Sequence, residues 1–128
     1  MRLLLDTHAL LWWVADDGRL SARARALVGD GANEVFVSAV TAWEIVVKAG
    51  IGRLEVPEPI DRFVVAQLEA NAFHPLAITM RHALGLATLP DVHRDPFDRM
   101  LASQAVTEEL TLVSCDRVFA AYPVATEW

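Results

Sequence analysis

The feature that most constrains the fold is the regular alternation of short apolar segments with longer amphipathic ones. The apolar segments are predicted to be strands: RLLL (2–5), EVFVS (34–38), FHPLAI (73–78) and TLVSC (111–115), with a short fifth strand near Val124. Helices are predicted between them, over 9–14, 22–28, 40–50, 60–70, 80–87 and 96–109. Because strands that alternate with helices form parallel sheets covered on both faces, the pattern predicts an α/β fold. The predicted architecture is a three-layer α/β/α sandwich with a mainly parallel central sheet.

Length and composition indicate a single folded domain that spans residues 1–128. Of the 128 residues, 54% are hydrophobic, which is enough for a sizeable core. No apolar run approaches the roughly 20 residues that a membrane helix needs, so no membrane association is predicted. Asp6 interrupts the apolar N-terminus, which favours a strand and a helix there over a signal peptide. Cys115 is the only cysteine, so no internal disulfide can form, which fits a cytoplasmic protein. Cys115 is expected to be a buried strand residue and not a nucleophile.

The charge pattern limits the function classes. A net charge of −6 disfavours a protein that coats nucleic acid without specificity. It is compatible with an enzyme whose acids gather in one metal-filled cleft. Lys48 is the only lysine, so the other basic residues are arginines. Arginine makes planar, bidentate contacts with phosphate or carboxylate, although it serves surface solubility equally well.

Four acidic residues from distant segments are predicted to meet at one edge of the sheet. In a parallel α/β sheet, the carboxyl ends of the strands and the N-termini of the following helices share an edge, where ligands bind. Asp6 ends the first strand, and Asp116 follows TLVSC. Glu44 lies near the start of the third predicted helix, and Asp98 near the start of the helix that returns to the strand at 111–115.

These acids also have purely structural interpretations. Asp6 and Asp116 can each cap the helix or turn that follows. Thr41 and Glu44 form a T-x-x-E capping box, with Lys48 as a partner of Glu44 four residues on.

The stretch HRDPFDRML contains two aspartates, and either one is a candidate for the third acid. Asp95 precedes a proline, which is typical of a helix N-cap. Asp98 falls in the first helical turn, where a negative charge is favourable. Asp98 is also in line with Leu101 and Ala105, on the apolar side of its helix, where a carboxylate is costly unless a cation compensates it. We therefore assign the chemistry to Asp98 and the cap to Asp95.

A divalent metal ion is the simplest cation for this predicted cluster. Crowded carboxylates repel one another and raise their pKa values, and a metal relieves both effects. Ligands that are all oxygen suit Mg²⁺ or Mn²⁺. The histidines share no metal-ligand spacing, which argues against zinc: His8, His74, His82 and His93. Because no G-x-S-x-G elbow, Cys/His pair or P-loop is present, the pattern favours metal-activated water that attacks a phosphodiester.

Four longer strings resemble a known family: LLLDTHALLWW, VSAVTAWEIVVKAGIGRLEVP, LPDVHRDPFDRMLASQA and LVSCDRVF. They resemble the PIN-domain ribonucleases, specifically the VapC-type toxins of toxin–antitoxin pairs, nearly from end to end. The resemblance implies one PIN-like nuclease domain, a Mg²⁺-dependent endoribonuclease that cleaves RNA and is usually a homodimer. It implies catalytic, metal-binding acids at Asp6, Glu44, Asp98 and Asp116, with Thr7, Asp95 and Ser114 as supporting residues.

The same resemblance implies a VapB-type antitoxin whose C-terminal segment enters the active site. We expect that partner to present a cation, most simply an arginine, to the acidic edge. Trp12, Trp13 and Trp43 are expected to offer apolar surface near it.

Two other functions fit part of the pattern. A phosphatase or phosphotransferase would use Asp6 as nucleophile, but it needs a second aspartate two residues on, where this chain has His8. A binding module on the same fold would be non-catalytic, and the intact set of acids argues against it.

Overall fold

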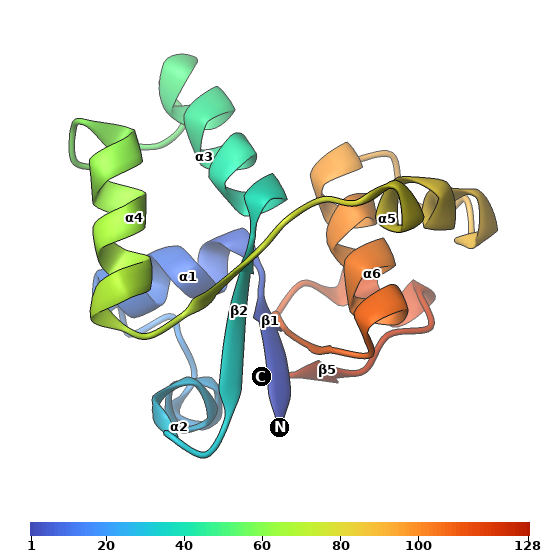
Figure 1. Cartoon of the computed structure of the whole chain (residues 1–128), viewed down its shortest axis with the longest axis horizontal. Coiled ribbons are helices and arrows are strands. Elements are labelled where there is room, and N and C mark those ends of the chain that lie inside the picture. The colour runs from blue at the N-terminus through green and yellow to red at the C-terminus, as the bar shows by residue number, and fades with distance from the viewer.

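The computed structural model describes residues 1–128 and contains a five-stranded sheet in the order β3-β2-β1-β4-β5. All neighbouring strands are parallel. The strands are β1 (Arg2–Leu5), β2 (Glu34–Ser38), β3 (His74–Leu76), β4 (Thr111–Val113) and β5 (Thr126–Glu127). The helices are α1 (Thr7–Val14), α2 (Ala22–Gly29), α3 (Ala39–Gly50), α4 (Ile60–Ala70), α5 (Met80–Gly85) and α6 (Pro96–Glu108). Two short 3₁₀ helices are η1 (Leu86–Thr88) and η2 (Arg117–Ala121). Figure 1 shows β1 at the centre of the molecule.

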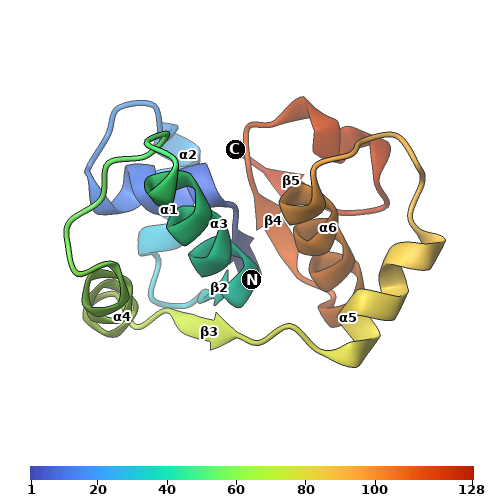
Figure 2. The same cartoon turned by 90° about the horizontal axis from the view of Figure 1, so that it is seen from above.

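The sheet separates two hydrophobic cores, and β1 contributes to both because side chains alternate along a strand. Leu3 and Leu5 point into the core formed with α1, α2 and β2, whereas Leu4 points into the core formed with α6. All three leucines are fully buried. In Figure 2, α1, α2 and α4 lie on one side of the sheet, and α5 and α6 on the other. The predicted three-layer α/β/α sandwich is confirmed.

Several predicted boundaries were wrong by a few residues. The strand TLVSC ends at Val113, because its partner β1 ends at Leu5 and turns into a helix, so the ladder has no further partner. Cys115 is therefore exposed, and its prediction as a buried strand residue was wrong. The first helix begins at Thr7, two residues earlier than predicted. The fifth strand starts at Thr126, just after its predicted place.

No helix in the structure combines the length and the apolar character needed to cross a membrane.

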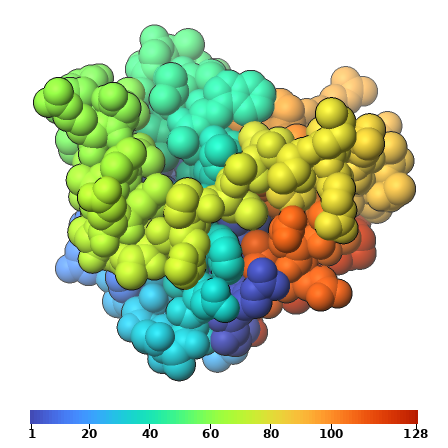
Figure 3. All heavy atoms as spheres, in the orientation of Figure 1, coloured from blue at the N-terminus to red at the C-terminus, as the bar shows by residue number.

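The segment from α4 to α5 crosses the sheet at its edge and carries β3, which pairs only with β2. Pro75 predicts such an edge position, because proline cannot donate a hydrogen bond to a strand on both sides. Figure 3 shows this segment (yellow-green to yellow) lying across the molecule between the half that contains α4 and the half that contains α6.

A buried polar network fastens this crossing segment to α6 and to the end of β2. The Ser38 hydroxyl donates to Oε1 of Gln104 at 2.5 Å, and the Gln104 amide donates to the carbonyl of Ala77 at 3.3 Å. His82 is fully buried beside them, and its Nε2 lies 2.8 Å from a carboxylate oxygen of Glu108. The network holds together the elements that carry α3 and α6, which frame the functional site.

We predict that Gln104→Leu lowers the free energy of unfolding by about 2–3 kcal/mol, because it leaves the Ser38 hydroxyl and the Ala77 carbonyl without their partner. Urea denaturation measures the change. Gln67→Leu on α4 is the control: its side chain makes no hydrogen bond within the chain, so its effect should stay within about 0.5 kcal/mol. Equal effects of the two substitutions would contradict the network's role.

Candidate active site

The register of the sheet brings the ends of the central strands to one level. Leu5 of β1 lies opposite Val37 of β2 and Val113 of β4. The residues that follow, Asp6 after β1 and Ser114 after β4, therefore leave the sheet side by side. This is the edge at which the sequence predicts the acidic residues to meet.

A cavity of about 150 Å³ lies at this edge and has no hydrophobic residue in its wall. Its lining residues are Asp6, Thr7, His8, Glu44, Lys48, Asp95, Asp98 and Asp116. The structure thus brings together the four predicted acids with Thr7 and Asp95. Ser114 lies behind the wall, where its Oγ accepts a hydrogen bond from the Asp116 N–H at 3.0 Å.

Asp6 serves as a helix cap and also lines the cavity. Its Oδ1 accepts a hydrogen bond from the Ala9 N–H at 2.7 Å, which makes Asp6 the N-cap of α1. Burial raises the pKa of Asp6, and hydrogen bonds from Ser114 and from the Ala9 N–H offset part of that rise. The structural and the functional interpretation of this residue are therefore compatible.

Glu44 is buried, and each of its two carboxylate oxygens has a partner. Thr7 donates to its Oε1 at 2.6 Å, and Lys48 forms an ion pair with its Oε2. The capping-box interpretation was wrong: Ser38 is the N-cap of α3, while Thr41 and Glu44 lie inside the helix. The predicted pairing of Glu44 with Lys48 is confirmed.

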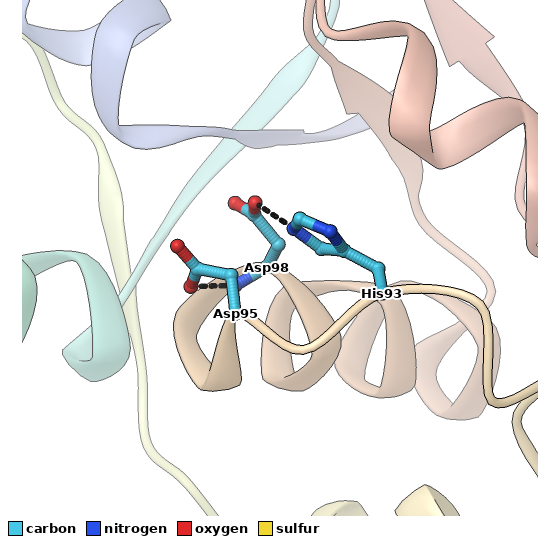
Figure 4. Close-up of side chains that lie close together, drawn as sticks. All are labelled: His93, Asp95 and Asp98. Atoms are coloured by element: carbon cyan, nitrogen blue, oxygen red, sulfur yellow. Dashed lines mark hydrogen bonds and ion pairs between the residues drawn. The ribbon is translucent and has the colours of Figure 1, made fainter.

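The prediction that Asp95, and not Asp98, caps α6 is confirmed. Oδ1 of Asp95 accepts hydrogen bonds from the Phe97 N–H at 2.8 Å and the Asp98 N–H at 3.2 Å, so Asp95 is the N-cap of α6. Asp98 makes no capping bond. Its Oδ2 lies 2.9 Å from Nε2 of His93, as Figure 4 shows. His93, Asp95 and Asp98 each offer one ligand atom within 4.8 Å of the others.

The surroundings of Asp98 disfavour its charged form. The pKa of Asp98 is raised to about 6, mainly by burial. The nearby carboxylates of Asp95, Asp116 and Glu44 contribute to the rise, and the hydrogen bond to His93 opposes it. At neutral pH the charge on Asp98 is thus unfavourable unless another cation enters the cavity.

Asp116 is the most exposed of the four predicted acids. It is the N-cap of η2, because its Oδ1 accepts a hydrogen bond from the Val118 N–H at 3.0 Å. The predicted turn interpretation is therefore confirmed, and Asp116 still lines the cavity.

Sequence reasoning missed two histidines of the site. His93 was set aside because the histidines share no metal-ligand spacing, yet it bonds Asp98. His8 lines the cavity, where it follows Asp6 in the first turn of α1. The available signal was their position beside the predicted acids, within two residues of Asp6 or Asp95.

Comparison with known proteins shows the family of the chain. A family model described as PIN domain matches residues 3–125. The chain belongs to the PIN-domain family. A protein named Ribonuclease VapC22, from Mycobacterium tuberculosis, is 30% identical over 116 residues, which cover 90% of this chain and 87% of that protein. This relative places the chain among the VapC-type members.

Solved structures of VapBC complexes share the fold. VapBC2 from Rickettsia felis, bound to a DNA fragment from its promoter, matches with a TM-score of 0.74 and 16% identity over 99% of this chain and 98% of that chain. DNA-bound VapBC from Salmonella typhimurium matches with a TM-score of 0.70 and 18% identity, over 99% and 97% of the two chains. The likeness confirms the α/β architecture of the PIN domain.

We predict that Asp98→Asn stabilises the metal-free protein by about 1–3 kcal/mol at pH 7.5, because it removes a charge whose pKa in the folded state lies above its unfolded value. Because the carboxyl pKa is raised in the folded state, the folded protein takes up this proton at a higher pH than the unfolded chain does. The penalty on the wild type is therefore full above pH 6 and fades as the pH falls toward 4.

Chemical denaturation in EDTA at several pH values measures this difference. The control is Asp91→Asn, which changes an exposed acid that makes no hydrogen bond and should show no such pH-dependent gain. A gain for Asp98→Asn that is the same at pH 4 and pH 7.5 would contradict the electrostatic origin.

Proposed function

We propose that the protein is a Mg²⁺-dependent endoribonuclease that acts as the toxin of a toxin–antitoxin pair. The observation that carries the proposal is the convergence of four acids from four distant segments in one wholly polar cavity. Membership of the PIN-domain family and the similarity to a protein named as a ribonuclease support it.

The donor set of the cavity fits a hard divalent cation. The residues that would hold Mg²⁺ or Mn²⁺ are Asp6, Glu44, Asp98 and Asp116. Asp98 and Asp116 each use one carboxylate oxygen in a hydrogen bond and keep the other available. The raised pKa of Asp98 indicates the same need for positive charge. When bound, a divalent ion supplies the charge that activates water and neutralises the phosphate.

The chain's own residues orient these acids. The Ala9 N–H and Ser114 hold the carboxylate of Asp6, and the Thr7 hydroxyl holds that of Glu44. Asp95 fixes the start of α6, so that Asp98 faces the cavity from the first turn of that helix. Rigid carboxylates positioned in this way bind a cation and a phosphodiester with little reorganisation.

A phosphatase that uses Asp6 as nucleophile is less well supported. Asp6 is buried, and its Oδ1 already accepts a hydrogen bond as the cap of α1. His8, two residues on, is exposed on the cavity wall and cannot replace the second aspartate as an acid of that type of enzyme. The polar cavity with several carboxylates also distinguishes the chain from a non-catalytic module.

We also propose a VapB-type antitoxin as partner, in line with the VapBC complexes that share the fold. A groove of about 540 Å³ between α1, the loop at 54–57 and α4 adjoins the acidic cavity, since His8 lines both. Its wall includes Trp12, Leu54 and Phe63. An antitoxin segment seated there would bring an arginine to the acids, where the two charges attract at short range.

A homodimer is the proposed oligomeric state. Trp43 and Val46 on α3 are 52% and 54% exposed, and the neighbouring Val47 is also exposed. An apolar helix face of this kind suits contact with a second copy of the chain. Trp12 and Trp13, in contrast, are half-buried, and Trp13 donates a hydrogen bond to Asn71 at 3.0 Å.

We predict that the purified protein cleaves single-stranded or loop RNA with Mg²⁺ or Mn²⁺ and that EDTA abolishes cleavage. Asp98→Asn should fold normally and lose activity by orders of magnitude, because it removes a charge that would bind the ion. Asp95→Asn should keep most of the activity, since asparagine caps a helix as well as aspartate does.

Cleavage assays on both variants, with melting temperatures as a check of folding, measure these effects. Cleavage that survives thorough chelation would refute the metal dependence. If Asp95→Asn were the inactive variant and Asp98→Asn still cut RNA, the assignment of the third acid would be reversed.

We predict that the small protein encoded beside this gene binds the chain and relieves its toxicity. Phe63→Glu in the groove should weaken the complex at least about tenfold, because it places a charge in an apolar contact. RNA cleavage should remain, since Phe63 lies outside the acidic cavity. Co-purification and growth assays measure both effects, and a neighbouring protein that neither binds nor restores growth would contradict the pairing.

A further inference from the structure

We propose that Lys48 is a substrate-binding residue of this site, whose ammonium group binds the scissile phosphate of the RNA. The inference rests on the proposed ribonuclease function and adds a residue to it. Lys48 lies on α3, one helical turn after Glu44, and lines the acidic cavity.

Lys48 is the only residue in the cavity wall with a permanent positive charge. The wall holds five carboxylates, one histidine and no arginine. All other basic residues of the chain are arginines, and they lie elsewhere. A phosphodiester that enters this cavity meets strong repulsion, so a fixed cation inside the wall has a direct use in binding it.

A chain of hydrogen bonds from Thr7 through Glu44 holds the ammonium group of Lys48 in position. The Thr7 hydroxyl donates to Oε1 of Glu44, and Oε2 of Glu44 pairs with Nζ of Lys48. The Glu44 side chain is 7% exposed and that of Lys48 is 28% exposed. Most of the lysine stem is therefore covered, and the charged end reaches the cavity from a rigid support.

Lys48 has donors to spare for a substrate. An ammonium group carries three N–H donors, and the pair with Glu44 is the only hydrogen bond that the Lys48 side chain makes. Two donors remain for phosphate oxygens, so the residue can bind the substrate without giving up Glu44.

This arrangement also suits the reaction. Hydrolysis adds water across the phosphodiester: a new bond joins the water oxygen to phosphorus, the bond to the leaving ribose oxygen breaks, and a proton lost by the water is gained by that leaving oxygen. Negative charge grows on the phosphate oxygens in the transition state, and a preorganised cation stabilises that charge more than it stabilises the ground state. Lys48 would thus affect the rate of cleavage as well as RNA binding.

The competing explanation is that Lys48 only neutralises Glu44 within α3. An ion pair of this spacing on a helix stabilises it slightly. In that case Lys48 would act through Glu44, and its removal would disturb cation binding by Glu44. The two explanations therefore differ in what happens to metal affinity.

The experiment compares Lys48→Met and Lys48→Arg with Arg62→Met in the full-length chain. Arg62 is an exposed residue of α4 that makes no hydrogen bond and lies outside the acidic cavity, so its substitution controls for the loss of one positive charge. Three quantities are measured: kcat and KM for RNA cleavage, Mn²⁺ affinity by calorimetry, and the salt dependence of binding to a non-cleavable DNA oligonucleotide. Melting temperatures show whether each variant folds.

For Lys48→Met we expect kcat/KM to fall at least about 100-fold, as for the loss of one group that stabilises transition-state charge. Mn²⁺ affinity should stay the same or rise, because a neighbouring positive charge is removed. The slope of log binding constant against log salt should shrink by about 0.7, the value for one lost phosphate contact on a single strand. Lys48→Arg should retain activity within about tenfold of the wild type, and Arg62→Met within about threefold.

Two results would overturn the proposal while leaving the ribonuclease function in place. One is cleavage by Lys48→Met within about threefold of the wild type. The other is a parallel loss of Mn²⁺ affinity and activity, which would show that Lys48 acts only through Glu44. If Lys48→Met fails to fold, the same three measurements on Lys48→Gln, which also removes the charge, decide the question. A folded wild type that cleaves no RNA with Mg²⁺ or Mn²⁺ would instead overturn the ribonuclease function, and the role of Lys48 with it.

Discussion

Five carboxylates share one small cavity at the carboxyl edge of the sheet, and their mutual repulsion has to be offset by groups that the fold supplies. Parallel strands supply part of the answer, because each strand is followed at this edge by the start of a helix. Asp6 and Asp95 sit at the N-termini of α1 and α6, where the helix dipole and unpaired backbone N–H groups favour negative charge. Lys48 and the histidines supply the rest. The sheet edge that gathers the acids thus also supplies the helix N-termini that stabilise their charge.

This coupling explains how much the sequence could predict. The parallel pairing and the meeting of the four acids at one edge follow from periodicity and from where each strand ends, whereas the order of the strands was not predicted. The choice between cap and chemistry could not be made at Asp6 or Asp116, because a residue at a helix N-terminus on this edge can cap the helix and still line the cavity. The prediction that each residue is a cap was correct, but it left out that each residue also lines the cavity.

Other details depended on contacts that no local pattern records. The T-x-x-E string suggested a cap at Thr41, but α3 begins directly after β2, so Ser38 takes that place and Glu44 moves into the second turn. The bond from His93 to Asp98 depends on how the loop before α6 folds back over the helix. The exposure of Cys115 depends on where β1 stops, which is a property of a distant segment.

The polar network beneath the site shows why the cavity keeps its shape despite its charge. Ser38 caps α3 through its hydroxyl oxygen, and the same hydroxyl donates to Gln104 of α6. The helix that carries Glu44 and Lys48 and the helix that carries Asp98 are therefore linked through one buried side chain. Trp43 and Phe97 add a second link, with their rings 4.8 Å apart in an edge-to-face contact. Because these links lie outside the cavity, they support the positions of α3 and α6 independently of the charges on the acids between them.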